Sequence, residues 1–264
     1  MILEEIYTYP VKSTHRVTHL YSQVHPWGLE GDRRWMMIDE NDRFITQREI
    51  PRLSLIQAVP QLSGQLVLTA PGQTAILTEI PYRTAMTVSV TIWDDTVIAR
   101  VADDPINSWL SHVLGHTLRL VYMHDSNSRR ITSSDCQLGA SVSFADGFPL
   151  LCTTTASLEE LNNRLDVPLP MGRFRPNVVV SGNHPFAEDD WKRIQIGEVI
   201  FQVIKPCKRC LITTVDQDTA SQGKEPLRTL NQFRKINTNV YFGINMIPEN
   251  TGRIERGNMV EVLQ

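Results

Sequence analysis

Short apolar runs separated by polar turns make up most of the first hundred residues. Their β-branched and aromatic content and their lengths are typical of strands in globular proteins. The segments that we expect to form strands are 3–9, 17–23, 35–38, 53–59, 65–69 and 86–90. Two alternating segments around Asp94-Asp95 also predict a hairpin over 87–101. Many short strands with polar connections favour a barrel or a sandwich.

A helical period begins at Asp103-Asp104-Pro105. Because Asp can cap the free amides of a first turn and proline is tolerated there, we predict a helix that Gly115 ends. Further helices are expected at 157–165 and 226–233. The strands expected after the first helix are 178–181, 194–196, 199–204, 240–247 and 258–263, and the polar segment 125–138 is expected to be a loop.

Together these elements predict a mainly β fold with a few helices, of the α+β class. The 264 residues suffice for one large or two ordinary domains. Because the character of the chain changes after the first helix, we place a boundary near residue 120. The expected domains are therefore 1–120 and 121–264.

The overall charge changes this picture little. A net charge of -3 and a pI near 6.2 give no general attraction to nucleic acid or to an anionic membrane. No apolar run approaches the roughly 20 residues of a membrane span, and Glu4 and Glu5 lie where a signal peptide needs basic residues. We therefore expect no nucleic-acid or membrane partner. Four cysteines without framework spacing favour a reducing compartment, which predicts a cytoplasmic protein.

The segment 205–216 contains the most informative chemistry. Lys208 and Arg209 lie between Cys207 and Cys210, and the chain then runs into 211–215, which has the composition of a buried strand. Neighbouring cations favour the thiolate, which is the form that attacks electrophiles and binds metals. A single cysteine is more often a small buried apolar residue. Two of them flanking a pair of cations indicate a reactive or metal-binding site.

Three chemistries could use this pair of thiols. A dithiol redox centre needs the first cysteine at the start of a helix, which the expected strand disfavours. A structural zinc site needs a second pair of ligands, but Cys136 and Cys152 stand alone. In the third, one thiolate completes the coordination of a soft or high-valent metal whose other ligands belong to a cofactor. The residues alone leave these alternatives open.

Several basic residues lie next to prolines or at expected strand ends, where the backbone direction is fixed. Guanidinium groups bind phosphate in a bidentate fork, so such cations would bind an anionic cofactor if they met in one cleft. They are Lys12, Arg33, Arg34, Arg48, Arg52 and Arg175. Asp146, in a turn of the form Asp-Gly-x-Pro, could transfer protons or cap its own turn. The pair His112 and His116 lacks a third metal ligand, and no hydrolase, dinucleotide or P-loop motif occurs.

A series of short motifs, in order along nearly the whole chain, resembles the MOSC-domain family. The likeness is strongest to the mitochondrial amidoxime-reducing components and the bacterial YcbX-type proteins. The motifs are Tyr9-Pro10-Val11-Lys12-Ser13, Gly31-Asp32-Arg33-Arg34-Trp35, Thr46-Gln47-Arg48, Pro51-Arg52-Leu53, Asp146 to Leu151, Phe174-Arg175-Pro176-Asn177, Trp191, Ile196-Gly197-Glu198, Pro206-Cys207-Lys208-Arg209-Cys210 and Thr213-Thr214-Val215-Asp216. Each motif is short, but their joint order is specific.

The resemblance implies an N-terminal MOSC_N domain, β-barrel-like, packed on a C-terminal MOSC β-barrel domain, with a molybdenum pyranopterin cofactor between them. Cys210 would then be the metal ligand and a catalytic residue, with Asp146 beside the metal as a second catalytic residue and Cys207 as a neighbour. The residues implied to hold the pterin and its phosphate are Lys12, Ser13, Arg33, Arg175 and Asn177. Further contacts, mainly through the backbone, are implied at Gly147, Phe148 and Lys208.

The implied function is an oxidoreductase that reduces N-hydroxylated compounds such as hydroxylamines and amidoximes. YcbX-type proteins often continue into a ferredoxin domain with C-x4-C-x2-C spacing, which this sequence lacks. Electrons are therefore expected from a separate donor protein, either ferredoxin-like or a flavin reductase, and the substrate is a small molecule. The alternative is a sulfur or molybdenum-cofactor carrier that uses a persulfide on Cys210.

Overall fold

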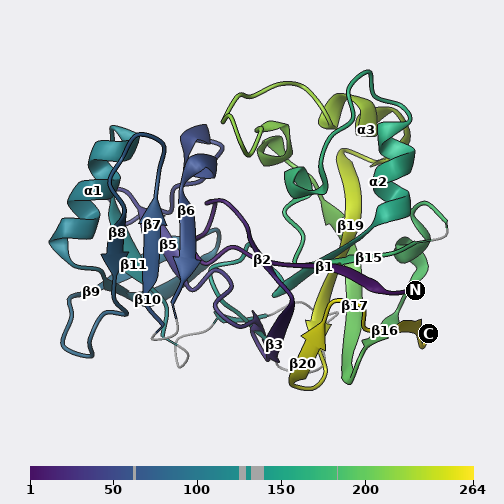
Figure 1. The fold of residues 1–264 in the computed structure, drawn as a ribbon, viewed down its shortest axis with the longest axis horizontal. Coiled ribbons are helices and arrows are strands. Elements are labelled where there is room, and N and C mark those ends of the chain that lie inside the picture. The colour runs from purple at the N-terminus through teal and green to yellow at the C-terminus, as the bar shows by residue number, and fades with distance from the viewer. Residues whose placement is uncertain (62–63, 125–128, 132–139, 183) are drawn as a thin grey trace.

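The computed structural model describes residues 1–61, 64–124, 129–131, 140–182 and 184–264. They form two lobes built mainly of strands, as Figure 1 shows. Three α-helices lie in the described residues: α1 (Asp104–Leu114), α2 (Thr155–Asn162) and α3 (Leu227–Phe233). The expectation of a mainly β, α+β fold is confirmed.

One large sheet organises the second lobe. Its strand order is β2-β1-β15-β14-β19-β17-β16-β21, and β18 pairs with β19 outside this path. The strands are β1 (Leu3–Thr8), β2 (Val17–His19), β14 (Leu150–Thr154), β15 (Val178–Val180), β16 (Arg193–Ile196), β17 (Val199–Lys208), β18 (Lys235–Ile236), β19 (Asn239–Pro248) and β21 (Val260–Val262). β14 and β15 are parallel, and every residue of both is buried. Continuous apolar runs suit such strands, since both faces are covered.

Smaller sheets build the first lobe and the join between the lobes. A four-stranded sheet has the order β5-β11-β10-β9, and three-stranded sheets have the orders β20-β3-β4 and β6-β7-β8. Their strands are β3 (Tyr21–His25), β4 (Gly28–Leu29), β5 (Trp35–Ile38), β6 (Gln57–Pro60), β7 (Leu66–Thr69), β8 (Ile76–Thr78), β9 (Thr87–Ile92), β10 (Asp95–Val101), β11 (Arg119–Tyr122) and β20 (Gly252–Glu255). β12 (Arg129–Arg130) pairs with β13 (Ser141–Val142).

The opening segment of the chain belongs to the second lobe. β1 pairs with β15 near residue 180, and β3 pairs with β20 near residue 253. In Figure 1 the purple β1 lies across the green and yellow strands. Tyr9, which directly follows β1, is 1% exposed. The residues after β1 are therefore held between the lobes, while the division near residue 120 stays a prediction.

Several expected elements differ from the observed ones. The segment 17–23 forms two strands, and 53–59 begins with the 3-10 helix η1 (Pro51–Leu55) before β6. The hairpin over 87–101 is confirmed, but its turn is Trp93-Asp94. Most of the loop expected at 125–138 lies outside the described residues.

Helix ends show which capping rules apply here. α1 ends at Gly115 with φ 73°, as expected for a left-handed C-terminal residue, but the Asp103 side chain makes no capping hydrogen bond. α2 starts two residues before its predicted start, since the Thr154 side chain accepts from the Ser157 amide. Among the described residues, no helix has the length and apolar content needed to cross a membrane.

The segment 211–215 was predicted to be a buried strand, and this prediction is wrong. Its residues form the 3-10 helix η5 (Leu211–Thr214), and Leu211 is 55% exposed. The hydroxyls of Thr213 and Thr214 donate to the carbonyls three residues earlier, at 2.9 and 2.8 Å. Such side-chain bonds offer the backbone an alternative to a strand ladder, so composition alone misled the prediction.

Candidate functional site

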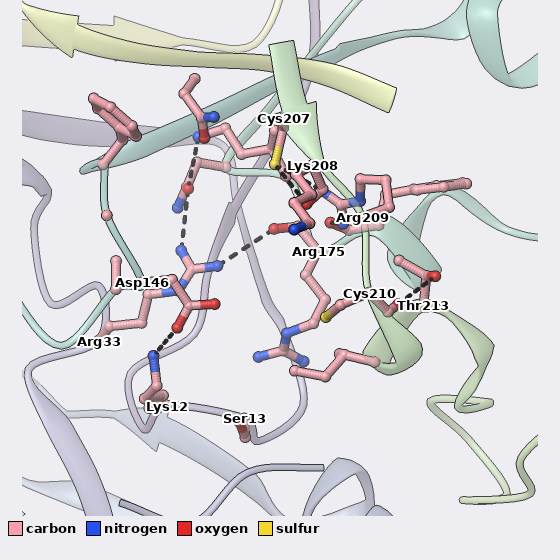
Figure 2. Close-up of a pocket in the computed structure, with 18 of the residues that line it drawn as sticks. Lys12, Ser13, Arg33, Asp146, Arg175, Cys207, Lys208, Arg209, Cys210 and Thr213 are labelled. Carbon is pink, nitrogen blue, oxygen red and sulfur yellow. Dashed lines mark hydrogen bonds and ion pairs between the residues drawn. The ribbon is translucent and has the colours of Figure 1, made fainter. Parts of the chain in front are cut away.

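One pocket between the lobes brings the predicted site residues together. Figure 2 shows them converging from segments far apart in the sequence. The residues predicted from the sequence that line this pocket are Lys12, Ser13, Arg33, Asp146, Gly147, Phe148, Arg175, Asn177, Lys208 and Cys210. Cys207 and Arg209 line it as well. Convergence within one cavity is what a shared site requires.

Strained backbone marks three of these positions. Ser13, Arg33 and Arg175 have φ of 68°, 48° and 55°, in the left-handed region that side chains other than glycine seldom occupy. Such conformations cost of order 1–3 kcal/mol each and persist only where the surroundings hold them. They cluster at binding and catalytic sites, so their presence at three pocket residues supports a functional pocket.

Arg33 is the centre of a buried hydrogen-bond network. Its guanidinium donates to the Asp32 carboxylate at 2.6 Å, to Asn177 Oδ1 at 3.0 Å and to the Arg175 carbonyl at 3.3 Å. The Arg33 and Arg175 guanidiniums lie 4.4 and 4.0 Å from the Tyr9 ring. Burial raises the pKa of Tyr9 to about 12, so this phenol is neutral at physiological pH. The network joins residues from both lobes into one rigid wall.

Two buried glutamines support the neighbouring cation. Arg175 Nη1 donates to the Thr14 carbonyl at 2.8 Å and to Gln217 Oε1 at 3.0 Å. Gln217 donates to Gln47 Oε1 at 3.0 Å, and Gln47 donates to the Ser13 carbonyl at 2.7 Å. Burial lowers the pKa of Arg175 to about 10, so the group stays charged near pH 7. The pair of amides therefore fixes both Arg175 and the backbone of Ser13.

Asp146 forms an ion pair with Lys12, which also donates to the Phe144 carbonyl at 2.8 Å. Trp93 Nε1 donates to Asp146 Oδ1 at 3.3 Å, and an Arg48 nitrogen lies 3.7 Å from Oδ2. Partial burial opposes ionisation, but the attraction of Lys12, aided by Arg48 and Trp93, holds the pKa of Asp146 well below its usual range. Asp146 is thus a carboxylate at neutral pH, which can accept hydrogen bonds but cannot donate one.

The two cysteines have different cationic neighbours. Arg209 Nη1 lies 3.0 Å from the Cys207 sulfur, whereas Cys210 is contacted by Arg48 Nη2 at 3.4 Å. Both cysteines are free thiols and partly exposed. The cation beside Cys210 therefore comes from the other lobe, 162 residues away.

Arg173 supports the segment that follows Cys210. Arg173 is 5% exposed. Its guanidinium donates to the carbonyls of Thr213 and Thr214, each at 2.9 Å. It also lies 3.4 Å from the Asp216 carboxylate. The Thr214 carbonyl also accepts from the Gly223 amide at 3.1 Å, so Arg173 adds a side-chain bond to this part of η5. Cys210, the residue that precedes η5, is thereby held at the pocket edge.

Sequence reasoning missed several residues around the pocket. Gln47 and Arg48 belong to the motif Thr46-Gln47-Arg48, but the sequence predicts no role for Gln47 and only a general anion-binding role for Arg48. Nothing in the sequence pointed to Gln217 or Trp93. Among the described residues, no group of three or more His, Cys, Asp or Glu side chains could hold a metal ion by itself.

Two family models match the chain. The model described as MOSC N-terminal beta barrel domain matches residues 1–117, and the model described as MOSC domain matches residues 139–261. Mitochondrial amidoxime-reducing component 1 from Mus musculus is 31% identical over 277 residues, which cover 98% of this chain and 81% of that protein. The chain belongs to the MOSC-domain family. The resemblance inferred from the motifs is confirmed.

Another relative is much longer than this chain. Molybdenum cofactor sulfurase from Oryza sativa subsp. japonica is 29% identical over 265 residues, which cover 92% of this chain and 32% of that protein. This MOSC chain therefore spans about a third of the length of that relative. The solved structure of the YUAD protein from Bacillus subtilis covers 98% of this chain and 93% of its own, with 12% identity and a TM-score of 0.44.

Proposed function

We propose that this protein binds a molybdenum pyranopterin cofactor and reduces N-hydroxylated compounds such as hydroxylamines and amidoximes. The observation that supports this best is the pocket itself, where the Cys210 thiol shares a cavity with Lys12, Arg33 and Arg175. A relative 31% identical over nearly the whole chain is named an amidoxime-reducing component. Location in the cytoplasm stays a prediction, since that relative is named mitochondrial.

The pocket residues fit such a cofactor chemically. Its phosphate needs cations, and Arg209 offers a buried Nε atom that has no hydrogen-bond partner within the described residues. A thiolate suits a soft or high-valent metal, so Cys210 would be the ligand. The residues that would hold the pterin and phosphate are Lys12, Ser13, Arg33, Arg175 and Asn177, with Gly147, Phe148 and Lys208 acting mainly through the backbone.

The protein groups would bind and orient the reactants. When bound, the molybdenum cofactor supplies the two-electron exchange that cleavage of an N–O bond needs. Overall, the substrate takes up two electrons and two protons, the N–O bond breaks and water leaves. The Asp146 carboxylate would accept a hydrogen bond from the N–OH group and hold the substrate at the pocket edge. A separate donor protein, ferredoxin-like or a flavin reductase, would supply the electrons.

Metal analysis and turnover test the proposal together. We expect near-stoichiometric molybdenum in the purified protein and reduction of hydroxylamine with an artificial electron donor. Cys210→Ser should retain its circular dichroism spectrum and lose turnover, whereas the matched variant Cys207→Ser should lose much less. Full turnover by cofactor-loaded Cys210→Ser would refute the ligand assignment.

A second candidate function is that of a sulfur or molybdenum-cofactor carrier. The relative named molybdenum cofactor sulfurase supports it, as does the accessible Cys210 sulfur beside Arg48. That sulfur could attack the outer sulfur of a donor persulfide, and the donor's inner sulfur would leave as a thiol. The same measurements separate the two candidates. A persulfide on Cys210 without molybdenum and without turnover would favour the carrier.

A further inference from the structure

Trp93 occupies a position that a tryptophan seldom takes. It is the first of the two residues between β9 and β10, and its φ is 54°. Two-residue hairpin turns that need a positive φ strongly prefer glycine, asparagine or aspartate. A bulky aromatic side chain there is a steric outlier. The hairpin itself gains nothing from this choice, so the reason must lie in what the indole contacts.

The indole is held beside the candidate site from three sides. Its Nε1 donates to Asp146 Oδ1 at 3.3 Å, the Arg48 guanidinium lies 4.9 Å from its ring, and the Phe44 ring packs edge-on at 5.3 Å. Arg48 in turn lies 3.4 Å from the Cys210 sulfur. One guanidinium thus separates the indole from the predicted metal ligand.

Despite these contacts, Trp93 is 49% exposed. Its orientation is fixed by polar and aromatic partners, so the exposed surface has a defined direction near the pocket edge. An immobilised aromatic surface loses little conformational entropy when a flat ligand stacks on it. Stacking on an aromatic side chain depends on the ligand having a π-face. A small saturated ligand has none.

We propose that Trp93 determines substrate specificity by stacking against the planar, conjugated part of an N-hydroxylated substrate. This inference rests on the proposed function and adds a preference for flat conjugated substrates over small ones. The neighbouring Asp146 carboxylate accepts the N–OH hydrogen bond while the indole covers the conjugated plane. The pocket residues bind the cofactor, and Trp93 selects what approaches it.

The test compares a planar with a small N-hydroxylated compound. In the molybdenum-loaded protein, Trp93→Gly should lower kcat/KM for benzamidoxime about tenfold, in keeping with the loss of one aromatic stacking partner. For hydroxylamine the change should stay within about twofold, and Trp93→Phe should recover most of the loss. Glycine suits a φ of 54°, so Trp93→Gly should keep or raise the melting temperature.

Tyr21→Ala is the matched control. Tyr21 is 54% exposed and stacks on the Arg253 guanidinium at 3.9 Å. It lies on β3, whereas Trp93 donates to Asp146, which lines the pocket. Its removal should leave the ratio of the two kcat/KM values unchanged. An equal ratio in wild type and Trp93→Gly would overturn the inference.

A binding measurement separates this inference from the proposed function. Calorimetric titration with benzamidoxime, without an electron donor, should show binding about tenfold weaker in Trp93→Gly than in wild type. If wild type binds benzamidoxime but reduces neither compound, the proposed function fails while the titration still decides the role of Trp93. Equal affinity in both proteins, or no binding by wild type, rejects stacking.

Discussion

The pocket has two walls of opposite character. The buried wall consists of Lys12, Ser13, Arg33, Arg175 and Asn177, and the open wall consists of Cys207, Lys208, Arg209 and Cys210. On the buried wall Lys12 is 5% and Asn177 is 1% exposed, whereas Lys208 on the open wall is exposed. The buried wall contains three left-handed residues and a dense hydrogen-bond network.

This difference separates two tasks. A preorganised wall of satisfied polar groups binds a large anionic ligand without having to rearrange, which preserves affinity. A thiol that must exchange ligands or meet a partner needs access, and the open wall provides it. Substitutions should therefore affect folding on the buried wall and mainly chemistry on the open wall.

The largest effect on stability is expected from Arg33→Met. The change leaves the Asp32 carboxylate, 3% exposed, without its cation and removes the bond to Asn177. Loss of one partner of a buried ion pair costs about 3–5 kcal/mol. Urea unfolding should show this loss, and Asp32→Asn in the same chain should restore part of it. A loss below about 1 kcal/mol would mean that the buried wall is not rigid.

Gln217→Leu should cost about 1–3 kcal/mol, the usual penalty for leaving buried polar groups unsatisfied. Gln47 and Arg175 would each lose a buried hydrogen bond. A double-mutant cycle with Gln47→Leu measures the coupling, which we expect to be about 1 kcal/mol because the two amides are in contact. Strict additivity would show that the two glutamines act independently.

Asp146→Asn should change the pH dependence of stability. Since the pKa of Asp146 is lower in the folded than in the unfolded protein, the unfolded state binds more protons below about pH 4. The contribution of Asp146 to the free energy of unfolding is therefore full above that pH. It is lost as the pH falls through the pKa of the folded state. The side chain is 53% exposed, which limits the contribution to about 1 kcal/mol or less. Unfolding curves from pH 2.5 to 6 should be flatter for the variant than for wild type.

Lys208→Met should have the smallest effect on folding, within about 0.5 kcal/mol, because the residue is exposed on the open wall. Thermal unfolding of Lys208→Met and of Arg33→Met, measured under the same conditions, provides the comparison. A loss as large as that of Arg33→Met would remove the distinction between the two walls.

The fold class and most strands could be predicted because they depend on local pattern. β5 lies at its predicted residues, whereas β8, β11, β14 and β20 were not predicted. The segment 211–215 failed because its conformation depends on Arg173, about forty residues earlier. Strand composition gives no information about such a partner.

The candidate residues that line the pocket were named through the order of the motifs, and periodicity had no part in it. The structure shows two contacts that the order of the motifs does not predict. Arg48 is the cation beside Cys210, and Gln217 accepts a hydrogen bond from Arg175. These contacts span 162 and 42 residues. Trp93 was missed for a different reason, because a tryptophan at a glycine-type turn position contradicts the usual turn rules.

The crossing of β1 into the second lobe limits the order of events during synthesis. On the ribosome, β1 gains its neighbour β15 only after residue 180 has emerged, and β3 gains β20 only after residue 255. Lys12 lies between β1 and β3, and Arg33 follows β4, so both pocket residues wait for partners that are made much later. The cavity therefore stays incomplete until Cys210 and Asn245, which also line it, have been synthesised.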